Sequence, residues 1–182
     1  MIIETNRLMI RSFQEPDIPE YAAVVADPKV TEFLGDGSPH SYEQAAAYVR
    51  DCMRSETKNG IARYAVILRE TEELIGFCGF KKVDDYIDFG WRYARRAWGN
   101  GYATEAAAAV LDQGINTLKL SGIVAESAVE NVGSVRVMEK IGMQFEAFGE
   151  VRGRKTVRYR QPSGAIWEGG ACKKSWVNEV KQ

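Results

Sequence analysis

Residues 96–106 of the chain read RAWGNGYATEA and hold the pattern that decides the fold. The segment lies between a strand-like run at residues 86–93 and an alanine-rich stretch at residues 102–116, which we expect to be a helix. Gly99 and Gly101 allow backbone angles and close approaches that a Cβ atom would forbid. The amide N–H groups of such a turn point into one concavity at the positive end of the helix dipole, which suits a pyrophosphate.

Two better-known glycine motifs do not fit this turn. The dinucleotide-binding pattern GxGxxG fails because residue 104 is threonine, and no Gly-Lys-Ser/Thr follows as a P-loop requires. Taken alone, the turn is equally well interpreted as an ordinary tight connection between a strand and a helix or as a phosphate-binding turn.

The hydrophobic pattern on both sides of the turn predicts an α/β (α+β) fold in a single domain over residues 1–182. The predicted strands are residues 8–13, 63–68, 74–80, 86–93 and 122–125, followed by two long strands between 144 and 176 around Pro162-Ser163-Gly164. The predicted helices are residues 18–26, 41–56 and 102–116, and one that starts at Asn131, with a buried face of Val132, Val135, Met138 and Ile141 and a C-terminal cap at Gly142.

Connection lengths predict how the strands pair. The short connections between residues 63 and 93 favour antiparallel hairpins, and strand–helix–strand over residues 86–125 requires one parallel crossover. We therefore expect one mixed, mostly antiparallel sheet with helices on both faces. Gly90 within its strand hints at a β-bulge.

Composition excludes several classes of function. The formal charge of the 182 residues is -1, from 24 basic and 25 acidic side chains, so nucleic acid is not an expected partner. No stretch approaches the ~20 apolar residues of a membrane span, and the first residues lack the apolar region of a signal peptide. Cys52, Cys78 and Cys172 are far apart, which predicts reduced thiols in a cytoplasmic protein without a metal site.

The glycine-rich turn also resembles a motif of a known family. Arg96, Gly99 and Gly101 match the coenzyme A motif Q/R-x-x-G-x-G/A of the GNAT acetyltransferase superfamily. Residues 98–106, WGNGYATEA, are similar to the W-G-x-G-Y-A-T-E-A run of its RimJ/RimL branch, the ribosomal-protein N-terminal acetyltransferases.

Two further segments resemble the same branch. Residues 4–11 (ETNRLMIR) are similar to its E-T-x-R-L-x-L-R start, and residues 130–143 (ENVGSVRVMEKIGM) to its E-N-x-x-S-x-R-V-x-E-K-x-G-F segment. Residues 74–76 and 88–91 fall at the expected spacing between them, so the resemblance covers nearly the whole chain.

The resemblance implies an acetyl-CoA-dependent N-acetyltransferase without a metal, in which an amine attacks the thioester directly and coenzyme A lies between two splayed parallel strands. A backbone N–H within residues 89–91 would meet the oxyanion, and the backbone of residues 91–93 would pair with pantetheine. Arg96 and the amides of residues 99–104 would hold the pyrophosphate. The implied cofactor-binding residues are Phe89, Gly90, Trp91, Arg92, Tyr93, Arg96, Gly99, Asn100, Gly101, Tyr102, Ala103, Thr104, Asn131 and Ser134.

The implied catalytic residues are Asp88, Asn131 and Ser134. Asp88 stands where many family members carry a glutamate that acts as the base, although a solvent-facing strand aspartate is an equally good interpretation; Glu146 and Glu150 are further candidates. Met138 occupies the place of the tyrosine that often acts as the acid, whereas Ser134 matches the serine of the RimL branch and would hydrogen-bond the thiolate. Asn131 would cap its helix and contact the pantetheine arm.

The expected partner is an amine acceptor, and the protein is expected to be a monomer or a homodimer. A peptide α-amine, with a pKa of about 7.7–8.0 against about 10.4 for lysine, needs about 3.4 kcal/mol less help to lose its proton, which favours a protein N-terminus. A small amine (amino acid, polyamine or antibiotic) and a non-catalytic acyl-CoA-binding module remain alternatives. The candidate acceptor residues are Phe33, Leu34, Tyr48 and Trp167, with Glu32, Asp36 and Glu168 as partners for a cation.

Overall fold

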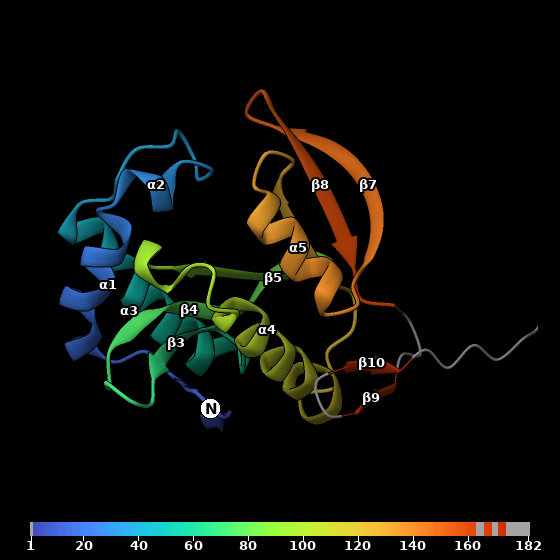
Figure 1. The fold of residues 1–182 in the computed structure, drawn as a ribbon, viewed down its shortest axis with the longest axis horizontal. Coiled ribbons are helices and arrows are strands. Elements are labelled where there is room, and N and C mark those ends of the chain that lie inside the picture. Colours follow the sequence, from blue (N-terminus) through green and yellow to red (C-terminus); the bar gives the residue numbers. More distant parts are fainter. Residues whose placement is uncertain (1, 163–165, 169–170, 174–182) are drawn as a thin grey trace, which may run out of the picture.

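Eight strands form one sheet in the order β1-β2-β3-β4-β5-β6-β8-β7 in a computed structural model that describes residues 2–162, 166–168 and 171–173 (Figure 1). The strands are β1 (Ile2–Glu4), β2 (Leu8–Arg11), β3 (Arg63–Leu68), β4 (Leu74–Val83), β5 (Tyr86–Tyr93), β6 (Ile123–Ala128), β7 (Gln144–Val151) and β8 (Arg154–Arg160). Every neighbouring pair is antiparallel except β5 and β6, which are parallel. The predicted mixed sheet with one parallel crossover is confirmed.

Helices cover both faces of the sheet, as the sequence predicts. The helices are α1 (Ile18–Val25), α2 (Pro28–Thr31), α3 (Tyr42–Asn59), α4 (Tyr102–Asp112) and α5 (Val132–Lys140), with short 3-10 turns at Glu15–Asp17 and Arg95–Ala97 and a π turn at Gln113–Thr117. Helices α1 and α3 pack with one set of strand side chains, and α4 and α5 with the other. Alternate residues of β3 and β4 point to these two cores, as the period of a strand requires.

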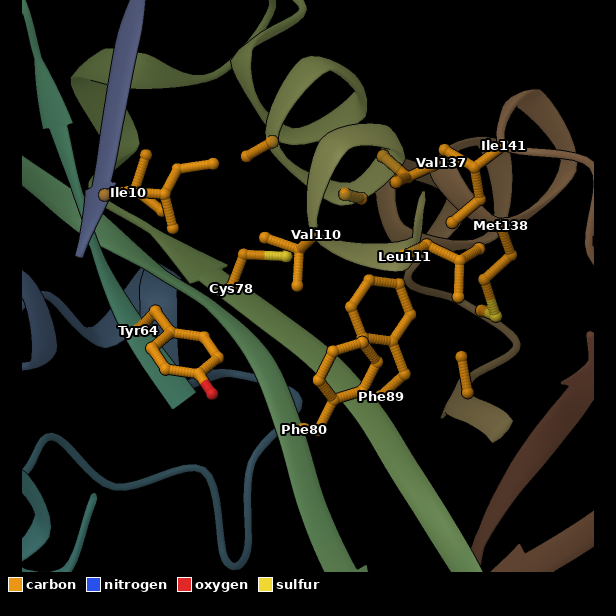
Figure 2. Packing of buried hydrophobic residues seen from close by; sticks show 14 of the residues in the cluster. Ile10, Tyr64, Cys78, Phe80, Phe89, Val110, Leu111, Val137, Met138 and Ile141 are labelled. Atoms are coloured by element: carbon orange, nitrogen blue, oxygen red, sulfur yellow. The ribbon is translucent and has the colours of Figure 1, made fainter. Parts of the chain in front are cut away.

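The larger core lies between the sheet and helices α4 and α5 (Figure 2). Phe80 and Phe89 from neighbouring strands stack with ring centroids 5.0 Å apart, below Val110 and Leu111 of α4 and Met138 of α5. Burial of these large apolar side chains fixes both helices on the sheet, and with them the connections that enter each helix. The ends of β5 and β6 are thereby held in place for the site described below.

The C-terminal hairpin differs from the prediction. We expected the strands to turn at residues 162–164, but β7 and β8 turn at Arg152 and Gly153, whose φ values are +53° and +76°. A two-residue turn with both residues left-handed matches the twist of a hairpin, so a short Arg-Gly pair suffices. A second, two-stranded sheet follows, formed by β9 (Ile166–Glu168) and β10 (Ala171–Lys173).

Three smaller predictions are also corrected. Strand β5 pairs with β4 without interruption from Tyr86 to Tyr93, so the expected bulge at Gly90 is absent. Val132 is 50% exposed at the first position of α5, and the buried face begins a turn later. Strand β2 ends at Arg11, earlier than predicted, and β1 was not predicted.

Candidate active site

One edge of β5 is left open beyond its first residues. Strand β6 pairs with β5 only at Ile87 and Asp88, and the two strands then separate. The Ile87 N–H points toward β6, where it donates to the Gly122 carbonyl oxygen at 3.1 Å, and the Ala94 N–H points the other way, to the Ile75 oxygen of β4 at 2.8 Å. Because backbone groups alternate sides along a strand, the N–H groups of Phe89, Trp91 and Tyr93 face the open edge, and those of Gly90 and Arg92 face β4. The open edge therefore presents a row of donors.

The carboxyl ends of β5 and β6 lie at the same end of the sheet because the two strands run parallel. The chain leaves β5 into the glycine-rich turn and α4, and leaves β6 into Asn131 and α5. Two helix N-termini therefore flank the open edge of β5. This is the position at which α/β sheets commonly hold ligands.

The glycine-rich turn prepares the N-terminus of α4 for an anion. Gly99 and Gly101 have φ values of +77° and +81°, the left-handed region that glycine adopts without strain. Gly101 is the N-cap and has no side chain to bond the first N–H groups of α4, so those of Tyr102, Ala103 and Thr104 have no partner within the helix. A Cβ at Gly99 would meet no atom within 4 Å, so the space over the turn is open. This open, positively polarised cup fits a diphosphate.

The N-terminus of α5 is closed in a different way. The Asn131 side-chain oxygen accepts a hydrogen bond from the backbone N–H of Ser134 at 3.2 Å, which confirms the predicted cap. The half-buried Ser134 hydroxyl has no hydrogen-bond partner among the residues that the structure describes. Met138, at the position of the tyrosine acid, is buried in the core. Ser134 thus offers a hydroxyl at the N-terminus of α5, beside the open edge of β5.

Comparison with known proteins places this geometry in a family. Residues 7–144 match the family model described as an acetyltransferase (GNAT) domain. The chain belongs to the GNAT acetyltransferase family. The uncharacterized N-acetyltransferase YnaD of Bacillus subtilis is 34% identical over 150 residues, which make up 81% of this chain and 85% of YnaD. The enzyme is therefore an acetyl-CoA-dependent N-acetyltransferase.

Solved GNAT structures share the architecture. An acetyltransferase of the family from Bacillus anthracis superposes with a TM-score of 0.78 at 29% identity, over 87% of this chain and 96% of that one. RimL, described as a ribosomal L7/L12 alpha-N-protein acetyltransferase in complex with coenzyme A, superposes with a TM-score of 0.77 at 16% identity, over 87% of this chain and 96% of RimL. At that identity, the likeness to RimL shows a common fold.

In this GNAT enzyme, Asp88 is bound in an ion pair. The Arg63 guanidinium contacts Asp88 Oδ2, and the side chains of Arg63 and Asp88 are 11% and 32% exposed. Gly90 explains how the arginine reaches the carboxylate, because a Cβ at Gly90 would lie 3.2 Å from the Arg63 guanidinium. The glycine that suggested a bulge thus makes room for a side chain from β3. Asp88 Oδ1 has no hydrogen-bond or ion-pair partner among the residues described, so one carboxylate oxygen is left without a contact of its own.

The other charged residues predicted for the site are Arg96, Glu146 and Glu150, and the first two are bound to other parts of the chain. Arg96 makes a 2.5 Å ion pair with Glu73 and donates to the Leu74 carbonyl oxygen at 3.4 Å. A contact between Arg96 and a phosphate would require this half-exposed guanidinium to leave Glu73. Glu146 accepts a 2.7 Å hydrogen bond from Arg160 Nε, and Glu150 is exposed on β7.

The face of β5 opposite α4 carries a cation among aromatic rings. Arg92 donates to the Tyr21 hydroxyl at 3.0 Å, and its guanidinium lies 5.8 Å from the Tyr48 ring centroid and 5.4 Å from that of Phe77. Its Nε atom is buried without a hydrogen-bond partner, and within residues 2–162 Arg92 has no acidic partner. Burial raises the pKa of Tyr48 well above its ordinary value, so its hydroxyl stays neutral.

The other candidate acceptor residues are scattered. Phe33 lies under the Arg154 guanidinium, 5.4 Å from the ring centroid, so the loop after α2 meets the β7–β8 hairpin. Glu32 pairs with Lys29 at 3.3 Å. Trp167, Glu168 and Cys172 lie in β9 and β10, of which the structure describes the backbone only. Cys52 and Cys78 are buried free thiols, and burial raises the pKa of Cys78 to about 12.

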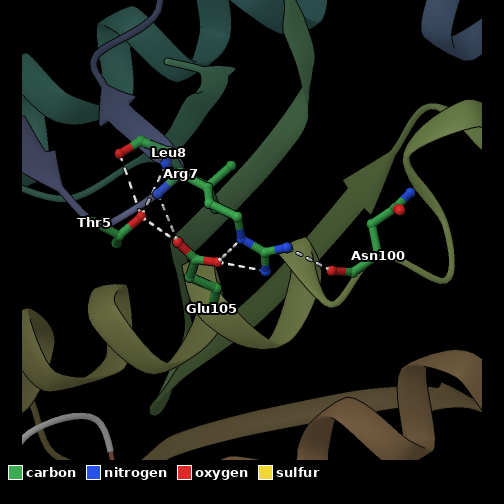
Figure 3. A network of polar contacts seen from close by, with 5 residues as sticks. All are labelled: Thr5, Arg7, Leu8, Asn100 and Glu105. Carbon is green, nitrogen blue, oxygen red and sulfur yellow. Dashed lines mark hydrogen bonds and ion pairs between the residues drawn. The ribbon is translucent and has the colours of Figure 1, made fainter. Parts of the chain in front are cut away.

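One cluster beside the cup was missed by sequence reasoning. Thr5 and Arg7, from the turn between β1 and β2, donate hydrogen bonds to Glu105 in the first turn of α4 (Figure 3). The motifs that contain these residues were each recognised, but nothing in the sequence indicated that they touch.

No helix in the described part of the chain is long and apolar enough to cross a bilayer.

Proposed function

We propose that the enzyme acetylates the α-amine of a protein N-terminus. The proposal rests on the ion pair between Asp88 and Arg63. The Asp88 carboxylate lies on β5, where its open edge begins, and Arg63 contacts one of its two oxygens. Only Oδ1 is left to take a proton, directly or through water. An α-amine, which loses its proton about 2.5 pKa units more readily than a lysine, suits such a base. The motif resemblance to the RimJ/RimL branch points to the same acceptor.

In the proposed mechanism, each residue has a separate task. Bound acetyl-CoA supplies the thioester whose acetyl group is transferred. The cup at residues 99–104 holds the diphosphate, and the free N–H groups of Trp91 and Tyr93 pair with the pantetheine arm. The Phe89 N–H, at the point where the strands part, donates to the carbonyl oxygen as it gains charge. The amine would attack the thioester carbonyl, so that a C–N bond forms, the C–S bond breaks and coenzyme A departs as a thiolate. Asp88 would take the amine proton and the Ser134 hydroxyl would hydrogen-bond the departing thiolate, while Asn131 would orient Ser134 and contact the pantetheine arm.

The acceptor is tested with matched peptides and labelled acetyl-CoA. One peptide has a free N-terminus and no lysine, and its partner has a blocked N-terminus and one lysine. We expect the label on the first peptide only, with its position confirmed by mass spectrometry. Labelling of the lysine peptide alone would overturn the proposal.

The role of Asp88 is tested by the pH dependence of the Asp88→Asn variant. Because the amide cannot take a proton, we expect kcat/KM to fall more at acidic than at alkaline pH, where the amine is already neutral. Arg63→Met is the matched control, since it leaves the carboxylate but removes its partner. A wild-type profile for Asp88→Asn would remove Asp88 from the mechanism.

One observation favours a second candidate, a small amine that carries a carboxylate. The Arg92 guanidinium has no acidic partner among residues 2–162 and lies in an aromatic setting, which suits a carboxylate and disfavours a polyamine. Amino acids and their amides separate the candidates, because only the acids can use Arg92. Rapid acetylation of an amino acid, lost on amidation and in Arg92→Ala, would favour this second function over the first.

A further inference from the structure

A compact network joins the N-terminal segment to the entry of α4 (Figure 3). Arg7 donates from Nε to Glu105 Oε2 at 2.7 Å, and its Nη2 atom lies 2.6 Å from the same oxygen. The Thr5 hydroxyl and the Arg7 backbone N–H donate to Glu105 Oε1 at 2.6 and 3.1 Å. Both carboxylate oxygens are therefore bonded, although the Arg7 side chain is 48% exposed.

Arg7 also fixes a peptide group of the glycine-rich turn itself. Its Nη1 atom donates to the Asn100 carbonyl oxygen at 2.9 Å. In a trans peptide, the carbonyl and the following N–H point in opposite directions, and the chain has no cis bond in its described part. The Gly101 N–H must therefore point away from Arg7. Gly101 is flexible on its own, so this bond selects one orientation of a donor in the cup.

Charge gives Arg7 a second effect. Glu105 lies one turn into α4, where its backbone N–H bonds to the Gly101 oxygen at 3.0 Å. An unpaired carboxylate there would offset the positive potential of the helix N-terminus and repel an incoming diphosphate. Arg7 cancels that charge through two contacts and stacks at 4.5 Å over the ring of Tyr102, the first residue of the helix.

We propose that Arg7 is a positioning residue for coenzyme A, which orients the Asn100–Gly101 peptide and neutralises Glu105 beside the diphosphate cup. The proposal rests on the proposed cofactor site at residues 99–104. Arg7 acts on the cofactor only indirectly, through the Asn100–Gly101 peptide and through Glu105.

The test measures coenzyme A binding by calorimetry and follows folding by thermal melting. Arg7→Ala should weaken the Kd about 10-fold or more, and Glu105→Gln by less than about 3-fold, because the glutamine leaves Arg7 free to bond Asn100. The double variant should bind more tightly than Arg7→Ala, since it lacks the unpaired carboxylate. The KM for acetyl-CoA should rise in Arg7→Ala while kcat at saturation changes little.

Arg69→Ala is the matched control. Arg69 holds the same segment by donating to the Thr5 carbonyl oxygen at 2.8 Å, but it does not touch the turn. We expect its Kd to equal that of the wild type. Equal weakening by Arg69→Ala and Arg7→Ala would mean general support of the segment and would overturn the proposal, as would a double variant as weak as Arg7→Ala.

Two outcomes separate this proposal from the cofactor site beneath it. If the wild type binds coenzyme A and Arg7→Ala binds it equally well, the role of Arg7 is wrong and the site stands. If the wild type does not bind coenzyme A, the site itself is wrong and the role of Arg7 falls with it. If Arg7→Ala does not fold, Arg7→Lys, which keeps the charge but loses the paired bonds, should show the intermediate Kd.

Discussion

The N-termini of α4 and α5 flank the same open strand edge but are completed in opposite ways. At α5 the Asn131 side chain bonds the Ser134 N–H, so the helix satisfies part of its own end. At α4 the N-cap is Gly101, which has no side chain, so the first N–H groups can be bonded only by a partner from outside the helix. The cap at α5 fixes the backbone from which the Ser134 hydroxyl projects, whereas the uncapped N-terminus of α4 is suited to bind an anion.

The largest effect is expected from a substitution in the glycine-rich turn at the uncapped N-terminus of α4. Gly99→Asp should weaken coenzyme A binding on the order of 100-fold, because like charges a few ångströms apart in a partly desolvated site repel by a few kcal/mol. Gly99→Asn is the matched control, since it has the same shape and tolerates a positive φ but adds no charge. We expect less than about 10-fold weakening for the asparagine, measured by calorimetry. Equal Kd values for the two variants would contradict an anion site at this turn.

A smaller effect is expected from the hydroxyl at the closed end. Ser134→Ala should lower kcat about 10- to 100-fold, the range expected for losing a hydrogen bond to a charged group. The helix cap should survive, because Asn131 bonds the backbone N–H of residue 134 rather than its side chain. Single-turnover rates and the Kd for coenzyme A separate the two effects. A lower melting temperature with an unchanged rate would assign Ser134 to structure alone.

Substitutions of Asn131 sharpen the comparison further. Asn131→Ala should cost about 1 kcal/mol of the free energy of unfolding through loss of the cap. Asn131→Asp keeps a cap acceptor but loses the amide donor, so stability should be retained while acetyl-CoA binding weakens. Urea unfolding and calorimetry are the measurements.

Ser41→Ala is the control for the Asn131 pair. Ser41 caps α3 by accepting from the Gln44 N–H at 3.3 Å, far along the chain from the cleft. It should lose about as much stability as Asn131→Ala with no change in the Kd. A change in the Kd for Ser41→Ala would show that helix stability alone explains the Asn131 results.

Local signals in the sequence were sufficient for much of the fold. The Ser41 and Asn131 caps and the glycine-rich turn each depend on residues close together in the chain, and all three form as predicted. The hairpin turn at residues 152–153 was missed because proline, serine and glycine at 162–164 looked like the stronger turn signal. An arginine with a positive φ has no distinctive signature in one sequence.

The candidate site was less predictable because its charges are paired over long distances. Asp88 is bound by Arg63, 25 residues away, and Glu105 by Arg7, 98 residues away. Alternation along β5 could place Asp88 on a face, but only the packing of β3 beside β4 shows which side chain meets it. Sequence patterns thus located the open helix end, and the structure was needed to find what holds it in shape.

The smallest expected effect concerns the carboxylate at that open end. Burial alone would raise the pKa of Glu105, but hydrogen bonds from Thr5 and Arg7 and the charge of Arg7 outweigh it, and the net pKa is lowered. The folded protein therefore keeps Glu105 ionised at a pH where the unfolded chain already binds the proton. The resulting stability is present above the unfolded pKa of about 4.3 and is lost as pH falls through the lower folded value.

Glu105→Gln should accordingly show a shallower loss of unfolding free energy than the wild type between roughly pH 5 and pH 3. Urea unfolding at a series of pH values measures it, and Arg7→Ala should flatten the curve in the same direction. An acid limb of Glu105→Gln as steep as that of the wild type would mean that the Arg7–Glu105 pair contributes nothing to holding the open end of α4, in contrast to the self-capped end of α5.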